Sequence, residues 1–299
     1  MKRKALVVGL GIGQLYVQEL KKLDYDVVTV DMDPSKNATY QLIDQALEHK
    51  YDVAHVCTPN TSHEQLAYRI AEQANIIFVE KPGLETEQRW HGLINAFPYK
   101  RITMIKNNQW RPQVQEWRDL LPTTRFVKLH WINYDRVPSP GSWFTRQALS
   151  WGGVSRDLMP HLLSIVAAVL PNEFDQKMPE YSMTQQRWRL RDLTATSYGT
   201  VNAQGVYDVD DIAQAEFKYR DIRVSVQADW RSLDEDDVSV KIYTPDLVSK
   251  FELGLCPDYV YGRMIADCVD NIDNDAFWYW QQRCDLWIHR VIDAISKSR

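Results

Sequence analysis

The feature that most constrains this chain is a cluster of glycines directly after an apolar segment near its start. Residues 4–8 form a mainly apolar run, as in a parallel strand that is covered on both faces. Gly9, Gly11 and Gly13 follow, and the next residues have the periodicity of a helix. Glycines at such a turn let the backbone approach a pyrophosphate, whose charge the helix N-terminus favours. We therefore predict a dinucleotide-binding unit at the start of the chain.

Asp31 supports this prediction, because it ends the second apolar segment, residues 26–30. An acidic residue there accepts hydrogen bonds from a ribose hydroxyl pair and repels a 2′-phosphate, so we expect NAD(H) rather than NADP(H). The third glycine stands one residue earlier than in the G-x-G-x-x-G pattern. A G-x-G-x-G turn also occurs in S-adenosylmethionine-dependent methyltransferases, which are the alternative at this point.

The remaining pattern indicates two domains. Strand-like and helical segments alternate as far as about residue 110, with further strands expected at 52–56, 76–79 and 101–105. A long strand is expected at 125–133, a helix at 152–170, several extended segments between 180 and 244, and a helical tail at 259–298. We predict an α/β protein. A Rossmann doubly wound parallel sheet occupies residues 1–122, and an α+β domain with a mainly antiparallel open sheet occupies 123–299.

Composition and charge narrow the classes of function. The net charge of −5 does not favour a nucleic-acid partner, and no apolar run is long enough to span a membrane. The four cysteines lack metal or disulfide spacing, which predicts reduced thiols in a cytoplasmic protein without a metal site. None of the eleven tryptophans precedes Trp90, and eight of them lie from Trp131 onward. The second half of the chain is therefore rich in tryptophan, whereas the first 89 residues contain none.

Polar motifs follow the expected strands. Thr58-Pro59-Asn60 and His63 come after one strand, and Glu80-Lys81-Pro82 comes after the next. The carboxyl ends of parallel strands meet at the edge where such folds bind ligands. A lysine at that edge can donate a hydrogen bond to a substrate oxygen and help to move its proton.

A second pair of chemical groups lies in the expected helix at 152–170. Asp157 and His161 are four residues apart, so they share one helix face. A histidine beside a carboxylate can exchange a proton near neutral pH. Pro160 stands between them, and we expect it either to bend the helix or to mark its first turn.

Taken in order along the chain, these motifs resemble those of the glucose–fructose oxidoreductase / inositol dehydrogenase / MocA family, and Gly152-Gly153 before Asp157 adds to the resemblance. The resemblance covers nearly the whole chain. It implies an NAD(P)-dependent oxidoreductase of sugars, polyols or related small molecules, which forms a homodimer or homotetramer through the open sheet. It also implies three catalytic residues, Lys81, Asp157 and His161.

The resemblance extends to residues that contact ligands. The implied cofactor contacts are Gly9, Gly11, Ile12, Gly13, Asp31, Thr58, Pro59, Asn60, His63, Glu80 and Lys81. The implied substrate contacts are Lys81, Asn108, Asp157 and His161, and we expect Trp143 and Trp151 to stack on the substrate.

Two alternatives stay open within the family besides the methyltransferase. Relatives that reduce planar C=N or conjugated groups share the same motifs, and the tryptophan-rich second half suits a planar substrate. A non-catalytic sensor that binds a dinucleotide and a sugar would keep the fold without needing the proton-transfer residues.

Overall fold

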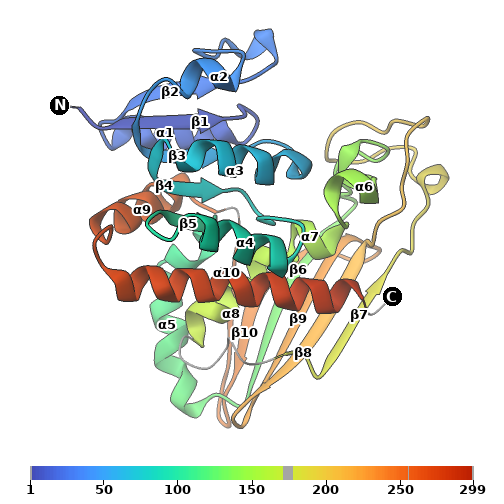
Figure 1. Ribbon diagram of the computed structural model, residues 1–299. Helices are drawn as coiled ribbons and strands as arrows, with labels where there is room; N and C mark the ends of the chain where they lie inside the picture. The colour runs from blue at the N-terminus through green and yellow to red at the C-terminus, as the bar shows by residue number, and fades with distance from the viewer. Residues whose placement is uncertain (1, 171–177, 255, 298–299) are drawn as a thin grey trace. The chain divides into compact units, whose positions relative to one another are not determined.

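Two structural units divide the chain, and neither is continuous in sequence. The computed structural model describes residues 2–170, 178–254 and 256–297 (Figure 1). The first unit comprises Met1–Trp110 and Pro257–Leu286, and the second comprises Arg111–Cys256 and Trp287–Arg299. The division thus differs from the expected boundary at residue 122, because part of the helical tail returns to the first unit.

The first unit contains the expected parallel sheet. Its strand order is β2-β1-β3-β4-β5, and every neighbouring pair is parallel. The strands are β1 (Lys4–Val8), β2 (Asp26–Val30), β3 (Tyr51–Val56), β4 (Ala74–Val79) and β5 (Arg101–Met104). From β1 the chain passes to β2 on one side, then crosses back to β3 on the other side of β1 and continues outward through β4 to β5. The carboxyl ends of β1 and β3 therefore form the switch point at which such sheets bind ligands.

Helices cover both faces of this sheet. Because crossovers between parallel strands are right-handed, the helix after β1 and those after β3 and β4 lie on opposite faces. The helices are α1 (Gly13–Lys22), α2 (Ile43–Ala46), α3 (His63–Ala71), α4 (Glu87–Ala96) and α9 (Asp258–Asp270). Helix α9 packs against α1, where a Cβ on Gly262 would lie 2.5 Å from a carboxylate oxygen of Glu19. This packing explains why a segment so late in the sequence belongs to the first unit.

The second unit is built on a six-stranded mixed sheet. Its strand order is β11-β10-β6-β9-β8-β7, and all neighbouring pairs are antiparallel except β6 and β9. The strands are β6 (Phe126–Tyr134), β7 (Tyr181–Gln185), β8 (Ile212–Tyr219), β9 (Ile222–Ser232), β10 (Asp237–Tyr243) and β11 (Val248–Glu252). The prediction of a mainly antiparallel sheet is therefore confirmed.

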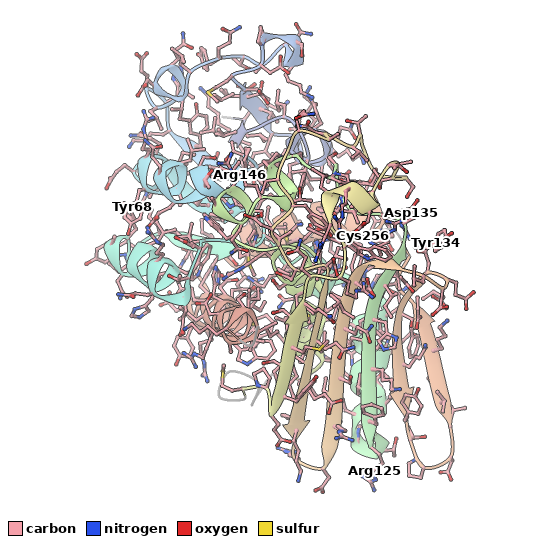
Figure 2. The ribbon with its side chains drawn as sticks, turned by 90° about the vertical axis from the view of Figure 1, so that its right-hand side faces the viewer. Tyr68, Arg125, Tyr134, Asp135, Arg146 and Cys256 are labelled. Carbon is pink, nitrogen blue, oxygen red and sulfur yellow. The ribbon has the colours of Figure 1, made fainter. Side chains whose placement is uncertain are left out.

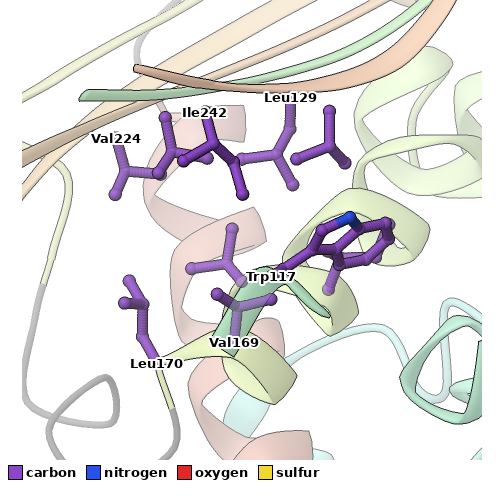
Figure 3. Close-up of a pocket in the computed structure, with 10 residues that line it drawn as sticks. Trp117, Leu129, Val169, Leu170, Val224 and Ile242 are labelled. Atoms are coloured by element: carbon purple, nitrogen blue, oxygen red, sulfur yellow. The ribbon is translucent and has the colours of Figure 1, made fainter. Parts of the chain in front are cut away.

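Helices pack on one face of this sheet. They are α5 (Gln113–Leu120), α7 (Val154–Asp157) and α8 (Met159–Val169), and α10 (Asp275–Ser296) enters the unit with its last turns. Helix α6 (Gln147–Ser150) lies in the segment that follows β6 and contacts the short helix Trp143–Thr145. Trp117, Val169 and Leu170 line a small apolar void opposite Leu129, Val224 and Ile242 of the sheet (Figure 3). The other face carries many polar side chains, and the expected pairing of two copies through it stays a prediction.

The expected helix at 152–170 is divided into α7 and α8. Leu158 separates the two helices, and Pro160 lies in the first turn of α8. Proline is accepted there because the first amide groups of a helix have no partner within it. Of the two outcomes expected for Pro160, the first-turn position is the one observed. No helix among the described residues is long and apolar enough to cross a membrane.

His55 is an uncharged histidine in the core of the first unit. It is completely buried on β3, and its ring stacks on Tyr16 at 4.7 Å and on Phe78 at 4.6 Å between centroids. Among the described residues, neither ring nitrogen has a hydrogen-bond partner. Burial lowers the pKa of His55 to about 3, because the charged ring cannot be solvated there.

This burial predicts a pH-dependent stability. The unfolded chain protonates His55 below pH 6.5, whereas the folded chain does so only at about pH 3. Stability is therefore lost as the pH falls through this window, by at most ~1.4 kcal/mol per pH unit. His55→Phe keeps the ring stack and removes the titrating group. We expect its Tm to fall less steeply than that of the wild type between pH 6.5 and about pH 4 in scanning calorimetry.

His91→Phe is the matched control, because His91 is exposed on α4 of the same unit. Its Tm is expected to follow the wild-type pH dependence. Equal slopes for His55→Phe and the wild type would contradict the assignment of a buried neutral His55.

Candidate functional site

The turn after β1 has the geometry that a dinucleotide needs. Gly9 has a φ of +91°, and a Cβ there would lie 2.6 Å from the carbonyl oxygen of Cys57. Gly11 faces open space, with nothing within 4 Å of its Cβ position. Gly13 begins α1, and its Cβ position is 3.0 Å from Val7. The three glycines thus have the geometry of a tight turn, an open backbone and close helix–strand packing, which is the arrangement expected of a pyrophosphate-binding turn.

The start of α1 is suited to an anion. Within the described residues, no side chain caps this helix, and its first turn carries no acidic residue. The amide groups at a helix start carry partial positive charge, which favours a phosphate group. Gly11 and Ile12, directly before the helix, are exposed. These residues therefore fit the pyrophosphate of a dinucleotide.

Asp31 lies beside this turn. One carboxylate oxygen accepts a hydrogen bond from the amide of Leu10 at 2.6 Å, and the other accepts one from the amide of Asp33 at 2.9 Å. The side chain is half-buried at the end of β2. Its charge is thus fixed next to the glycine turn, which fits a ribose hydroxyl pair.

The segments that follow β3 and β4 are joined through His63. This residue begins α3 and is completely buried. Its ring nitrogens lie 2.8 Å from the carbonyl oxygen of Thr58 and 2.8 Å from that of Gly83. Burial lowers the pKa of His63, with the two carbonyl groups opposing the shift. His63 therefore links the Thr58-Pro59-Asn60 segment to the segment that contains Lys81.

Glu80 links the backbone at Lys81 to helix α1 through two hydrogen bonds. One of its carboxylate oxygens accepts a hydrogen bond from the hydroxyl of Tyr16 at 2.6 Å, and the other accepts one from the amide of Lys81 at 3.0 Å. Burial, with the nearby charge of Glu80, raises the pKa of Tyr16 well above its usual value. Glu80 is buried whereas Lys81 is half-exposed at the carboxyl end of β4.

The structure thus brings the predicted cofactor residues of the first unit to one edge of its sheet. Asn108 belongs to this unit as well, in the short helix Asn107–Trp110 after β5, and is buried. The sequence did not point to Tyr16, although its position on the buried face of α1 was a usable signal.

Asp157 and His161 stand out in the second unit by their exposure. Every other residue between 152 and 170 is buried, whereas these two are half-exposed. Asp157 is the last residue of α7, and His161 lies in the first turn of α8. The apolar segment therefore presents two polar side chains, four residues apart, that can take part in proton exchange.

Neighbouring residues fix Asp157. The indole Nε1 of Trp230 donates a hydrogen bond to its carboxylate at 2.9 Å. At the other end of α7, the carboxylate of Asp210 accepts hydrogen bonds from the amides of Gly153 at 3.1 Å and Ser155 at 2.8 Å. His161 lies against the ring of Trp131, with 5.3 Å between centroids. The sequence did not identify Trp230 or Asp210, because neither is near Asp157 in the chain.

The two tryptophans expected to stack on a substrate occupy different settings. Trp143 is half-buried and stacks on Phe144 at 3.9 Å. Trp151 follows the last residue of α6 in the left-handed conformation, with a φ of +66°, directly before Gly152.

Figure 2 shows Tyr134 and Asp135 at one end of β6 and Arg125 at its other end. Residues 135–153 therefore leave the sheet at the end where β6 finishes.

Among the residues that the structure describes, no group of three or more His, Cys, Asp or Glu side chains is arranged to hold a metal ion. The four cysteines are free thiols.

Comparison with known proteins defines the class. No family model matches the chain. The solved structure of GenD2 from gentamicin A biosynthesis, in complex with NAD, has a TM-score of 0.78 at 16% identity and covers 99% of this chain and 94% of its own. Levoglucosan dehydrogenase, in complex with NADH and levoglucosan, has a TM-score of 0.77 at 13% identity and covers 100% and 98%. The chain therefore has the two-unit α/β fold of these proteins.

A relative in sequence identifies the family. A protein of Amycolatopsis mediterranei (strain S699), named as an oxidoreductase subunit of UDP-kanosamine synthase, is 31% identical over 271 residues. The match covers 80% of this chain and 72% of the relative. The chain belongs to the same family of oxidoreductases as this relative. The predictions of an α/β fold and of an oxidoreductase are confirmed.

The glycine turn generates a test that separates binding from folding. Gly11→Ala places a methyl group in open space, so we expect its Tm to stay within about 2 °C of the wild type. The same methyl group stands where a pyrophosphate must approach. We therefore expect the Kd for NADH, measured by titration calorimetry, to rise at least about tenfold.

Gly9→Ala is the contrasting variant. Its positive φ and the close Cys57 carbonyl oxygen leave no room for a Cβ, so we expect a loss of stability of about 1–3 kcal/mol or more. Wild-type affinity for NADH in a folded Gly11→Ala variant would contradict the position assigned to the pyrophosphate.

Proposed function

We propose that this protein is an NAD(H)-dependent oxidoreductase of the glucose–fructose oxidoreductase / inositol dehydrogenase / MocA family. Its reaction moves a hydride between nicotinamide and a carbinol carbon of a sugar, polyol or nucleotide sugar. The observation that carries the proposal is the 31% identity over 271 residues to an oxidoreductase whose name includes a nucleotide sugar. The glycine turn, Asp31 and the Asp157–His161 pair support it independently.

The first unit would hold the cofactor. The open backbone at Gly11 and the start of α1 would bind the pyrophosphate, and Asp31 would accept hydrogen bonds from the ribose hydroxyl groups. When bound, the nicotinamide supplies the acceptor or donor of the hydride at its C4 atom. Thr58 and Asn60 follow β3 at the same edge, held there by His63.

The polar side chains would handle the substrate hydroxyl. In the oxidation direction, the imidazole of His161 takes the hydroxyl proton as the hydride leaves the carbinol carbon, and in reduction it returns that proton. The carboxylate of Asp157 stabilises the imidazolium and orients the substrate. The ammonium group of Lys81 donates a hydrogen bond to the substrate oxygen, which stabilises negative charge there.

The function can be tested with a panel of sugars, polyols and nucleotide sugars. Purified protein is incubated with NAD⁺, or with NADH and the matching ketones, and absorbance at 340 nm is followed. For a substrate that is turned over, we expect His161→Asn to lower kcat by about 10²–10⁴-fold, because general acid–base catalysis is lost. Binding of NADH, measured by calorimetry, is expected to stay close to that of the wild type.

His130→Asn is the matched control, because His130 lies on the polar face of the sheet, where it pairs with Asp237 at 2.8 Å. Its kcat is expected to match the wild type. Planar imines with NADH, and S-adenosylmethionine in calorimetry, are tested beside the panel. Three results would contradict the proposal: tighter binding of S-adenosylmethionine than of NADH, turnover of the planar imines alone, or NADH binding without turnover of any compound. The last result would favour the sensor.

Asp31 generates a separate test of cofactor preference. Asp31→Asn keeps an oxygen acceptor of the same size beside Leu10 but removes the charge that repels a 2′-phosphate. We expect the ratio of the Kd values for NADPH and NADH to fall at least about tenfold, or ~1.4 kcal/mol. Asp26→Asn, at the other end of the same strand, controls for net charge and should leave the ratio unchanged. An unchanged ratio in Asp31→Asn would show that another group selects the cofactor.

A further inference from the structure

Trp230 is a buried tryptophan whose indole N–H makes a hydrogen bond to a polar residue of the candidate site. It is 1% exposed on β9, and yet its indole nitrogen is directed at the half-exposed carboxylate of Asp157, 2.9 Å away. The two residues are 73 positions apart in sequence. An indole N–H can only donate, so this contact needs an acceptor, and an ionised carboxylate is a strong one.

The strand that carries Trp230 is itself held firmly. The amide of Trp230 donates to the carbonyl oxygen of Asp211 at 3.0 Å, and the amide of Arg136 donates to the carbonyl oxygen of Trp230 at 3.3 Å. The guanidinium group of Arg187 pairs with the carboxylates of Asp211 and Asp229, both of which are buried. These contacts fix the backbone of β9 at Trp230, from which the indole group extends.

Asp157 is fixed from the opposite side through α7. The side chain of Asp210 accepts three hydrogen bonds at the start of that helix, from the amides of Gly153 and Ser155 and from the hydroxyl of Ser155 at 3.0 Å. The carbonyl oxygen of Asp210 also accepts one from the amide of Val154 at 3.0 Å. The carboxylate of Asp157 is thus held between an anchored helix and an anchored strand.

We propose that Trp230 is a positioning residue for proton transfer, whose indole N–H holds the carboxylate of Asp157 in its working orientation. This inference rests on the proposed function and extends it to a residue outside the family motifs. A hydrogen bond from an N–H group also stabilises the ionised form of a carboxylate. The donor carries no proton that exchanges during the reaction, so it can fix Asp157 without competing with His161 for a proton.

The contact can be tested without any substrate. Protein labelled with ¹⁵N at its indole groups gives one signal for each of the eleven tryptophans, and Trp230→Phe assigns one signal by its loss. We expect Asp157→Asn to move this signal more than the other indole signals. We also expect it to follow the titration of a single carboxylate as the pH is lowered. A Trp230 signal that ignores Asp157→Asn would overturn the proposal even if the enzyme is active.

The kinetic arm uses the substrate and NAD⁺ from the panel described above. Trp230→Phe is expected to lower kcat about tenfold or more with little change in KM, and to move the acid limb of the pH profile to higher pH. In the Asp157→Asn background, the same substitution should have almost no further effect on kcat. Multiplicative losses in the double variant would show a general structural role and overturn the proposal.

Trp117→Phe is the matched control, because Trp117 is equally buried in the same unit and, among the described residues, its indole nitrogen has no hydrogen-bond partner. Its kcat and pH profile are expected to match the wild type. Absence of turnover with every substrate would count against the proposed function, while the indole signals would still decide whether Trp230 holds Asp157.

Discussion

One steric constraint recurs in both units: a backbone turn passes so close to a carbonyl oxygen that a side chain has no room. A Cβ on Gly9 would lie 2.6 Å from the carbonyl oxygen of Cys57, and one on Gly153 would lie 1.8 Å from that of Asp210. A helix follows each turn, α1 in the first unit and α7 in the second. The missing side chains therefore set where these helices begin, and so determine the positions of the glycine turn after β1 and of Asp157.

Buried polar groups then make these positions rigid. Burial raises the pKa of Asp211 and of Asp229, and the charge of Arg187 and neighbouring amide groups oppose that shift. Such carboxylates are costly inside a protein unless they are paired. Tryptophan suits the same setting, because it combines a large apolar ring with one N–H donor. Two buried tryptophans of the second half use both properties: the indole N–H of Trp278 donates to the carbonyl oxygen of Asn271, and that of Trp230 donates to the carboxylate of Asp157, each at 2.9 Å.

Much of the first unit could be predicted from the sequence because its signals are local. Each parallel strand is a short apolar run, and the glycine turn and Asp31 lie at fixed distances from such runs. The partners of Glu80 and Asp157 could not be predicted in this way. Tyr16 and Trp230 are 64 and 73 residues from the carboxylates they contact, and no periodicity links residues so far apart. The return of residues 257–286 to the first unit depends in the same way on a distant contact, that of α9 with α1.

The exceptional strand pair of the second sheet explains how these distant contacts arise. β9 and β10 are consecutive in the chain, and yet β6 lies between them and runs parallel to β9. Trp131 of β6 pairs with Ala228, so Trp131 and Trp230 lie near each other on one face of the sheet. The helices that carry Asp157 and His161 contact this face, α7 through β9 and α8 through β6 and β9. Because β6 lies beside β9, Trp131 of β6 contacts His161 and Trp230 of β9 contacts Asp157. The glycine turn proposed to bind the cofactor depends on spacing within one βα unit, whereas the groups that would move the proton depend on the topology of a whole sheet.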